Sequence, residues 1–153
     1  MTKDSRNLKL KPITRRDGGS RMYCGPAALC AITHNPYEDV RTAINQYRGR
    51  KLTTGVLGLS SVELRGAMRI LDVNHSQTKY PMDNPKTGRP PTLAAFLKNR
   101  KDDEMTRPLV IQLTGHYVVV KGRKFIDNHT IEPVFIRKAP HRRRRVVRYW
   151  IIG

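Results

Sequence analysis

A chain of 153 residues, 38% hydrophobic and 27% charged, is expected to form one globular domain rather than a disordered segment. Two cysteines are too few for a disulfide framework and indicate a reducing compartment, and no apolar run approaches the ~18 residues that cross a bilayer. Lys and Arg outnumber Asp and Glu by 30 to 12, and the resulting formal charge of +18 favours an acidic partner: nucleic acid, an anionic membrane surface or an acidic protein.

The N-terminal segment, residues 1–19, is predicted to be an irregular basic arm. Its lysines and arginines alternate with small and apolar residues, and it leads into the turn cluster Asp17-Gly18-Gly19-Ser20. The first ten residues contain no apolar stretch of the kind found in secretory signals, so a cytoplasmic location is expected. Residues 20–153 are expected to form the single folded domain.

The first half of that domain is predicted to be helical. Residues 24–33 are apolar on all sides, which is typical of a buried helix, and a proline lies in the first turn, where its missing N–H costs nothing. Apolar residues at helical spacing predict a second helix from about 36 to 47. Ser60 or Ser61 is expected to cap a third helix that ends near residue 71.

The next segment, residues 72–91, is the least regular, with four prolines and one short predicted strand near 73–80. Thr92 is expected to cap a short helix over 93–99, and a charged surface connection follows to residue 104.

After Pro108 the apolar period changes from 3.6 to 2, as in strands. Strands are predicted at 109–113, 116–120, 123–128, 132–138 and 146–152. Helices followed by an antiparallel sheet predict an α+β fold, with the helices packed on one face of the sheet.

Cys24 and His116 are candidates for a nucleophile and its base. Cys24 is at the expected N-terminus of a helix, where the helix dipole favours the thiolate, and His116 begins a strand. The backbone N–H of Cys24 is the expected oxyanion donor. The alternative is that Cys24 is a small core residue and His116 a structural histidine, in which case neither takes part in catalysis. Cys30 is expected to be a core residue.

A third residue would orient the imidazole, and the strand register decides which one it is. If Lys121-Gly122 is a two-residue turn, Val120 pairs with Arg123 and Asp127 lies opposite His116. A three-residue loop would place Asn128 there instead. Asp127 is therefore the first candidate and Asn128 the second.

The remaining candidate residues concern metals and anions. The histidines have no metal-ligand spacing with the cysteines, so neither a metal site nor a cofactor is expected. Four consecutive arginines, Arg142, Arg143, Arg144 and Arg145, form either a solvated strand end or a patch that binds phosphate groups of a polyanion. The other histidines are His34, His75, His129 and His141.

Three blocks of this chain resemble the papain-like cysteine peptidases, and most of all the branch that includes the bacteriocin-leader peptidase domains of export transporters. The blocks are Cys24-Gly25-Pro26-Ala27-Ala28-Leu29, the segment from Thr53 through Leu64, and Gly115-His116-Tyr117-Val118-Val119-Val120 with Asp127-Asn128. The resemblance implies the papain-like fold and a Cys-His-acid triad. It departs from the family at Gly18, where members carry a Gln that completes the oxyanion hole; Ser20 or Arg21 are the candidate substitutes.

Three functions are compatible with these features. The first is a papain-like cysteine hydrolase, most simply a peptidase acting on a protein or peptide, whose basic surface holds a polyanion. The second is a catalytically weak or inactive member that binds nucleic acid, as a bacteriophage protein in the host cytoplasm or the virion would. The third is an acyltransferase or deamidase that uses the same residues.

Overall fold

The computed structural model describes residues 9, 10, 12 and 23–153. Nearly all of the predicted basic arm, together with Gly18, Ser20 and Arg21, lies outside the described residues. Within the described part of the chain, no helix combines the length and apolarity that crossing a membrane requires.

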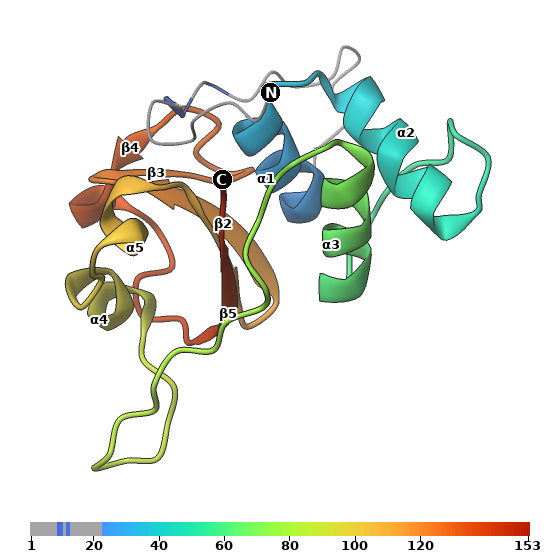
Figure 1. Cartoon of the computed structure of the whole chain (residues 1–153). Coiled ribbons are helices and arrows are strands. Elements are labelled where there is room, and N and C mark those ends of the chain that lie inside the picture. Colours follow the sequence, from blue (N-terminus) through green and yellow to red (C-terminus); the bar gives the residue numbers. More distant parts are fainter. Residues whose placement is uncertain (1–8, 11, 13–22) are drawn as a thin grey trace.

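The described chain begins with helices and ends with an antiparallel sheet, which confirms the α+β class (Figure 1). The sheet has five strands in the order β4-β3-β2-β1-β5, and every neighbouring pair is antiparallel. The helices are α1 (Cys24–Thr33), α2 (Tyr37–Arg48), α3 (Ser61–Ile70), α4 (Leu93–Lys98) and α5 (Asp103–Thr106). The strands are β1 (Leu109–Leu113), β2 (His116–Lys121), β3 (Lys124–Ile126), β4 (Val134–Phe135) and β5 (Val146–Ile151), and a 3-10 helix, η2, spans Ile136–Lys138.

The sheet separates two hydrophobic clusters. Val110 and Val119 face the cluster built from α1, α2 and α3, whereas Leu109 and Ile111 face the cluster that contains α4. Successive strand residues point to opposite faces, so alternating apolar residues on β1 and β2 fill both clusters. The prediction that all helices share one face is therefore wrong for α4, which lies on the other side of the sheet (Figure 1).

Helix α1 is the most buried helix, as its composition predicted. All residues from Gly25 to Ile32 are buried, and the helix ends at His34, whose backbone is left-handed with φ of 60°. Only its two ends approach the surface. The helix packs against β2, and the half-buried Cys24 at its N-terminal end makes hydrogen bonds with His116 and Tyr117 of that strand.

Three local predictions differ from the structure. The strand expected near 73–80 is reduced to two isolated bridges, from His75 to Ile152 and from Lys79 to Tyr149. The strand expected over 132–138 is split into β4 and η2, and the charged connection before β1 contains the short helix α5. The prolines and charged residues of these segments leave room for only short ladders.

The turn between β2 and β3 also differs from the prediction. Lys121 pairs with Lys124 and Val120 with Phe125, so the two-residue turn is Gly122-Arg123 rather than Lys121-Gly122. Gly122 has a φ of 58°, which suits a tight hairpin turn. The predicted pairing of Val120 with Arg123 is therefore wrong, and the regular ladder ends where Val119 pairs with Ile126.

Candidate active site

Cys24 is the first residue of α1, and the preceding Tyr23 is extended. Its backbone position gives the thiol the positive end of the helix dipole. Cys24 is half-buried, whereas Cys30, about 1.7 turns further along the helix, is buried in the core. Both cysteines are free thiols.

His116 begins β2, directly after Gly115, whose φ of 72° ends the turn from β1. Its side chain is only 6% exposed, and its Nε2 lies 2.9 Å from Asp127 Oδ2. The His116 side chain also makes a hydrogen bond with Cys24. Since Nε2 contacts the carboxylate, Nδ1 is the ring nitrogen left for the thiol.

Asp127 lies just beyond β3 and its carboxylate is completely buried. Its Oδ1 accepts hydrogen bonds from the backbone N–H groups of His129 at 3.0 Å and Thr130 at 2.8 Å. The hydroxyl of Thr130 in turn accepts the Asp127 N–H. This closed loop of bonds leaves Oδ2 aimed at His116, so Asp127 is the candidate that orients the imidazole.

The structure explains why Asp127 reaches His116 although the predicted register was wrong. The observed pairs place Asp127 beyond the end of the ladder, in line with Val118 across the hairpin. His116 lies two residues from Val118 and therefore on the same face of β2. The observed register puts Asp127 opposite Val118 rather than His116, a difference of two residues along β2. Since side chains alternate between the two faces of a strand, a difference of two leaves the side chain of residue 127 on the same face as His116.

The three groups change one another's protonation. Burial opposes the thiolate of Cys24, but hydrogen bonds from the His116 side chain and the Tyr117 backbone outweigh it and lower the pKa of the thiol. Burial likewise opposes the imidazolium of His116, but the bonds to Asp127 and Cys24 raise the pKa of the ring to about 9. Burial works against the Asp127 carboxylate as well, and the bond from His116 nevertheless holds its pKa below the usual range. Both shifts favour the charged forms of the pair, thiolate and imidazolium.

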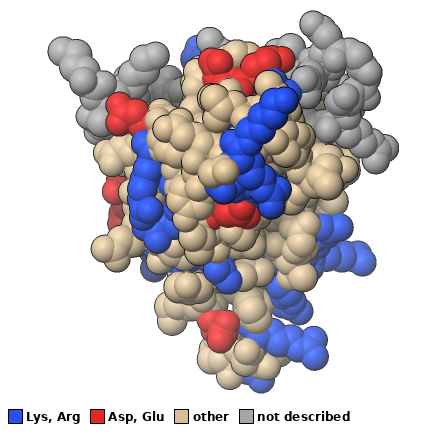
Figure 2. Space-filling view, turned by 90° about the vertical axis from the view of Figure 1, so that its right-hand side faces the viewer, with Lys and Arg blue, Asp and Glu red and all other residues tan. Residues whose placement is uncertain are grey.

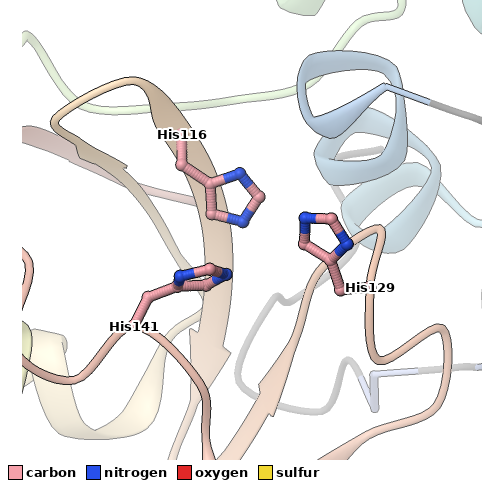
Figure 3. Close-up of side chains that lie close together, drawn as sticks. All are labelled: His116, His129 and His141. Atoms are coloured by element: carbon pink, nitrogen blue, oxygen red, sulfur yellow. The ribbon is translucent and has the colours of Figure 1, made fainter.

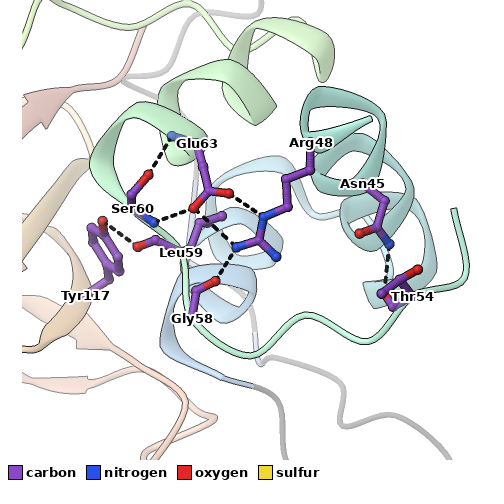
Figure 4. A network of polar contacts seen from close by, with 8 residues as sticks. All are labelled: Asn45, Arg48, Thr54, Gly58, Leu59, Ser60, Glu63 and Tyr117. Carbon is purple, nitrogen blue, oxygen red and sulfur yellow. Dashed lines mark hydrogen bonds and ion pairs between the residues drawn. The ribbon is translucent and has the colours of Figure 1, made fainter. Parts of the chain in front are cut away.

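A second polar network, drawn in Figure 4, holds the segment around Leu59, which packs against Gly25 in the first turn of α1. Glu63 accepts hydrogen bonds from the Arg48 guanidinium and from the backbone N–H of Ser60, while the Ser60 hydroxyl caps α3 by accepting from the Glu63 N–H. Arg48 also donates to the carbonyl of Gly58. These bonds join α2, the loop and the start of α3.

Tyr117 and Leu59 connect this network to the site. The Tyr117 hydroxyl donates to the Leu59 carbonyl at 3.0 Å (Figure 4). The Leu59 side chain packs against the α-carbon of Gly25, where a β-carbon would lie 2.8 Å from the Leu59 β-carbon. Glycine after the cysteine is therefore required by close packing. Strand β2 contributes both the candidate base, His116, and, one residue later, the anchor of this loop.

The Arg142–Arg145 run is only partly a free surface. Arg142, Arg143 and Arg144 are exposed, whereas Arg145 is half-buried and donates to the Pro90 carbonyl at 2.8 Å. Backbone carbonyls of Arg142 and Arg144 accept the first N–H groups of α4. The run thus caps a helix with its backbone and offers three guanidinium groups to solvent. Figure 2 shows that on another face, over α2 and α3, basic side chains alternate with acidic and uncharged ones.

Two histidines that the sequence analysis left without a role lie beside His116. The ring centroids of His116 and His141 are 4.6 Å apart, and those of His116 and His129 are 5.5 Å apart. His141 Nε2 is also 3.6 Å from Asp127 Oδ2. Nothing in the linear spacing reveals this cluster, because it depends on the loop that Asp127 closes and on the segment before β5. Their approach to the two catalytic candidates is the main feature that sequence reasoning missed.

A hollow of about 640 Å³ lies beside the proline-rich segment and is lined by Met82, Pro85, Thr92 and Arg145 among others. Its lining contains none of Cys24, His116 and Asp127, so it is separate from the candidate site.

Comparisons with protein-family models, with curated proteins and with solved structures found no match for this chain.

Proposed function

We propose that this protein is a papain-like cysteine hydrolase, most simply a peptidase, with Cys24 as nucleophile, His116 as general base and acid, and Asp127 as the residue that orients His116. One observation carries the proposal: a buried Asp127-His116 pair at 2.9 Å ends in a hydrogen bond to a half-buried thiol at a helix N-terminus. A core cysteine and a structural histidine have no need of this directional arrangement.

The residues account for each proton in the reaction. The Cys24 proton resides on His116 Nδ1, and the thiolate attacks the carbonyl carbon of the scissile amide to give a tetrahedral oxyanion near the Cys24 backbone N–H. The C–N bond then breaks as His116 gives its proton to the departing amine, which leaves a thioester. His116 next takes a proton from water, hydroxide attacks the thioester, and the thiol is regenerated with release of a carboxylic acid.

The different burial of the three residues is suited to this role. Cys24 is half-buried, while His116 and Asp127 are almost completely covered. Water exclusion around the imidazole-carboxylate bond strengthens it, because the local dielectric is low. An acyl group can therefore approach the sulfur without disturbing the pair behind it. The same geometry suits an acyltransferase or a deamidase, which differ only in the acceptor or leaving group.

The test compares the two cysteines by alkylation followed by mass spectrometry. Iodoacetamide at neutral pH should label Cys24 well before Cys30, because burial raises the pKa of the Cys30 thiol to about 12. A screen with peptide and protein substrates then identifies the bond that is cleaved. Equal slow labelling of both cysteines in the folded protein would contradict the proposal.

A second candidate function, polyanion binding, rests on the three exposed arginines Arg142, Arg143 and Arg144. They follow His141, which touches the His116 ring, so the basic run begins at the rim of the candidate site. Guanidinium groups bind phosphate bidentately, and this kind of affinity falls steeply with salt.

Heparin chromatography tests this candidate. Replacing Arg142, Arg143 and Arg144 by Ser should lower the eluting salt concentration more than removing three exposed charges elsewhere, at Arg50, Lys51 and Arg69. Equal effects of the two triple variants would show that net charge alone, rather than this run, retains the protein.

A further inference from the structure

Three imidazoles from separate segments converge beside the candidate active site (Figure 3). His116 comes from β2, His129 from the loop after β3, and His141 from the segment before β5. One ring nitrogen from each lies within 4.8 Å of the other two. It is the one group of three or more such donors in the described part of the chain.

The separations are close to those of a metal site. Bonds of about 2.1 Å at tetrahedral angles place pairs of nitrogens about 3.4 Å apart, so the rings need to approach one another by at most about 1.4 Å. Side-chain rotation supplies this, because His129 is exposed and His141 half-buried. Only His116 is fixed, by its bond to Asp127.

His141 adds an independent observation. Its Nε2 is buried and has no hydrogen-bond partner within the described part of the chain, although Asp127 Oδ2 lies 3.6 Å away. A buried polar atom without a bond is unusual and calls for a ligand or water. The residue also has a left-handed backbone, with φ of 65°, which is uncommon outside glycine and is found at ligand-binding positions.

We infer that His116, His129 and His141 form a binding site for a first-row divalent transition metal, with Zn²⁺ the best-suited ion, and that metal binding there switches off Cys24. Neutral imidazoles suit Zn²⁺, and three protein nitrogens leave a fourth position for water. Asp127, in contact with His116 and near His141, supplies the negative charge that a cation needs in this basic protein.

The inhibitory effect rests on the proposed function and follows from His116 being shared. A metal on Nδ1 occupies the lone pair that would accept the Cys24 proton. A metal on Nε2 displaces the Asp127 bond and leaves the proton of a neutral ring on Nδ1, where it faces the thiol. In both cases the imidazole can no longer act as the base, and the ring protons that the metal replaces pass to solvent.

Metal binding is measured on the full chain, stripped of metal, by Zn²⁺ titration in competition with a chromogenic chelator. His129→Ala and His141→Asn should each weaken binding by more than about 100-fold, since losing a ligand exceeds the 10–100-fold cost of losing an outer partner. Asn is chosen at 141 because it tolerates the left-handed backbone. His75→Ala is the matched control and should bind Zn²⁺ like the parent; circular dichroism confirms that each variant folds.

Cys24→Ser separates this site from simple capture by the thiol. It should retain the parent's Zn²⁺ affinity, and loss of binding in this variant would overturn the three-histidine site. Binding that survives in both His129→Ala and His141→Asn would also overturn it.

The switch is tested by the rate of Cys24 alkylation. Zn²⁺ should slow alkylation in the parent and His75→Ala, with recovery after chelation, but not in His129→Ala. The inhibitory role would be overturned if Zn²⁺ accelerated the alkylation of Cys24. It would also be overturned if the alkylation rate stayed the same at a Zn²⁺ concentration that saturates the site found by chelator competition. If Cys24 reacts as an ordinary thiol while three histidines are still needed for Zn²⁺, the metal site stands and the hydrolase proposal fails.

Discussion

Two carboxylates, Glu63 and Asp127, organise the two polar networks on either side of the candidate site, and they differ in their partners. Glu63 binds the permanently charged Arg48 and the Ser60 N–H, and its pKa falls to about 2, chiefly through the Arg48 bond. Asp127 binds His116, a group that can release its proton, and the bonds to Asp127 and Cys24 raise the pKa of that ring to about 9. On the proposed function, the difference teaches that a carboxylate paired with a permanent cation stabilises structure, whereas one paired with an imidazole in contact with a thiol supports chemistry.

The comparison predicts the largest effect on reactivity for His116→Ala. Removing the base should lower hydrolysis by about 10²–10⁴-fold, the usual contribution of general acid-base catalysis. Alkylation of Cys24 at neutral pH should fall as well, because the thiol loses the bond that lowers its pKa. The kinetics of iodoacetamide labelling measure this, with His75→Ala as control; unchanged labelling in His116→Ala would remove the distinction between the two networks.

Asp127→Asn is expected to have the next largest effect. Loss of the carboxylate removes a bond that raises the pKa of His116, so the imidazolium should deprotonate at lower pH than about 9. Hydrolysis should fall by about 10–100-fold, the cost of losing a group that orients a functional imidazole.

The pH profile of Cys24 alkylation tests the direction of both pKa shifts. In the parent, alkylation of Cys24 should persist well below pH ~8.5, the ordinary thiol value, and the imidazolium should be lost as the pH rises through about 9. The thiolate and the imidazolium coexist in the pH range between these two limits. In Asp127→Asn the upper limit of this range should move to lower pH. Labelling rates between pH 5 and 10 in the presence of a chelator measure both limits, and a wider window would contradict the role of Asp127.

Glu63→Gln should affect stability rather than chemistry. We expect a loss of about 1–2 kcal/mol in the free energy of unfolding, since the variant removes a charged hydrogen bond and half of a capping box from a partly exposed position. The folded pKa is depressed, so this contribution is present above the unfolded value of about 4.3 and is lost as the pH falls toward about 2.

Urea unfolding at neutral pH and at pH 3 measures that prediction. Glu38→Gln, in the first turn of α2, is the control and should change stability by less than about 0.5 kcal/mol. A marked fall in the Cys24 labelling rate of folded Glu63→Gln would show that the two networks are not separate in function.

The smallest effect is expected for Tyr117→Phe, which removes the bond to the Leu59 carbonyl. The cost should be about 0.5–1.5 kcal/mol, the net value of one hydrogen bond. Because Leu59 packs on Gly25 beside Cys24, the labelling rate should change with it by a few-fold at most. Thermal unfolding and alkylation of the same sample measure the two quantities, and a change confined to stability would show that the loop has no influence on the thiol.

Some of this arrangement was predictable from local chemistry. The buried helix beginning at Cys24, the Ser60 cap of α3 and the strand beginning at His116 each follow from periodicity and capping residues within about ten positions. Asp127 was predicted from a hairpin whose turn was placed one residue too early. Asp127 contacts His116 all the same, because strand alternation decides the face of a side chain, and moving the pairing partner by two residues leaves that face unchanged.

Other features depend on contacts that no local pattern encodes. The packing of α4 on the far face of the sheet follows from β1 being apolar on both sides, which a single run of Val, Leu and Ile does not distinguish from burial on one side. The approach of His129 and His141 to His116 requires the Asp127 loop and the segment before β5 to be in place together. Each is a tertiary outcome of several segments.

The separation of Cys24 and His116 along the chain has a consequence for synthesis. The helix that carries the thiol leaves the ribosome long before β2 is made, and until β2 and β3 dock against it the thiol has neither its hydrogen bond nor its counter-charge. A nascent or partly folded chain therefore carries an ordinary thiol at Cys24, and the proposed nucleophile forms only after β2 and β3 have docked. The labelling rate of Cys24 during translation therefore reports when α1 packs against β2 and β3.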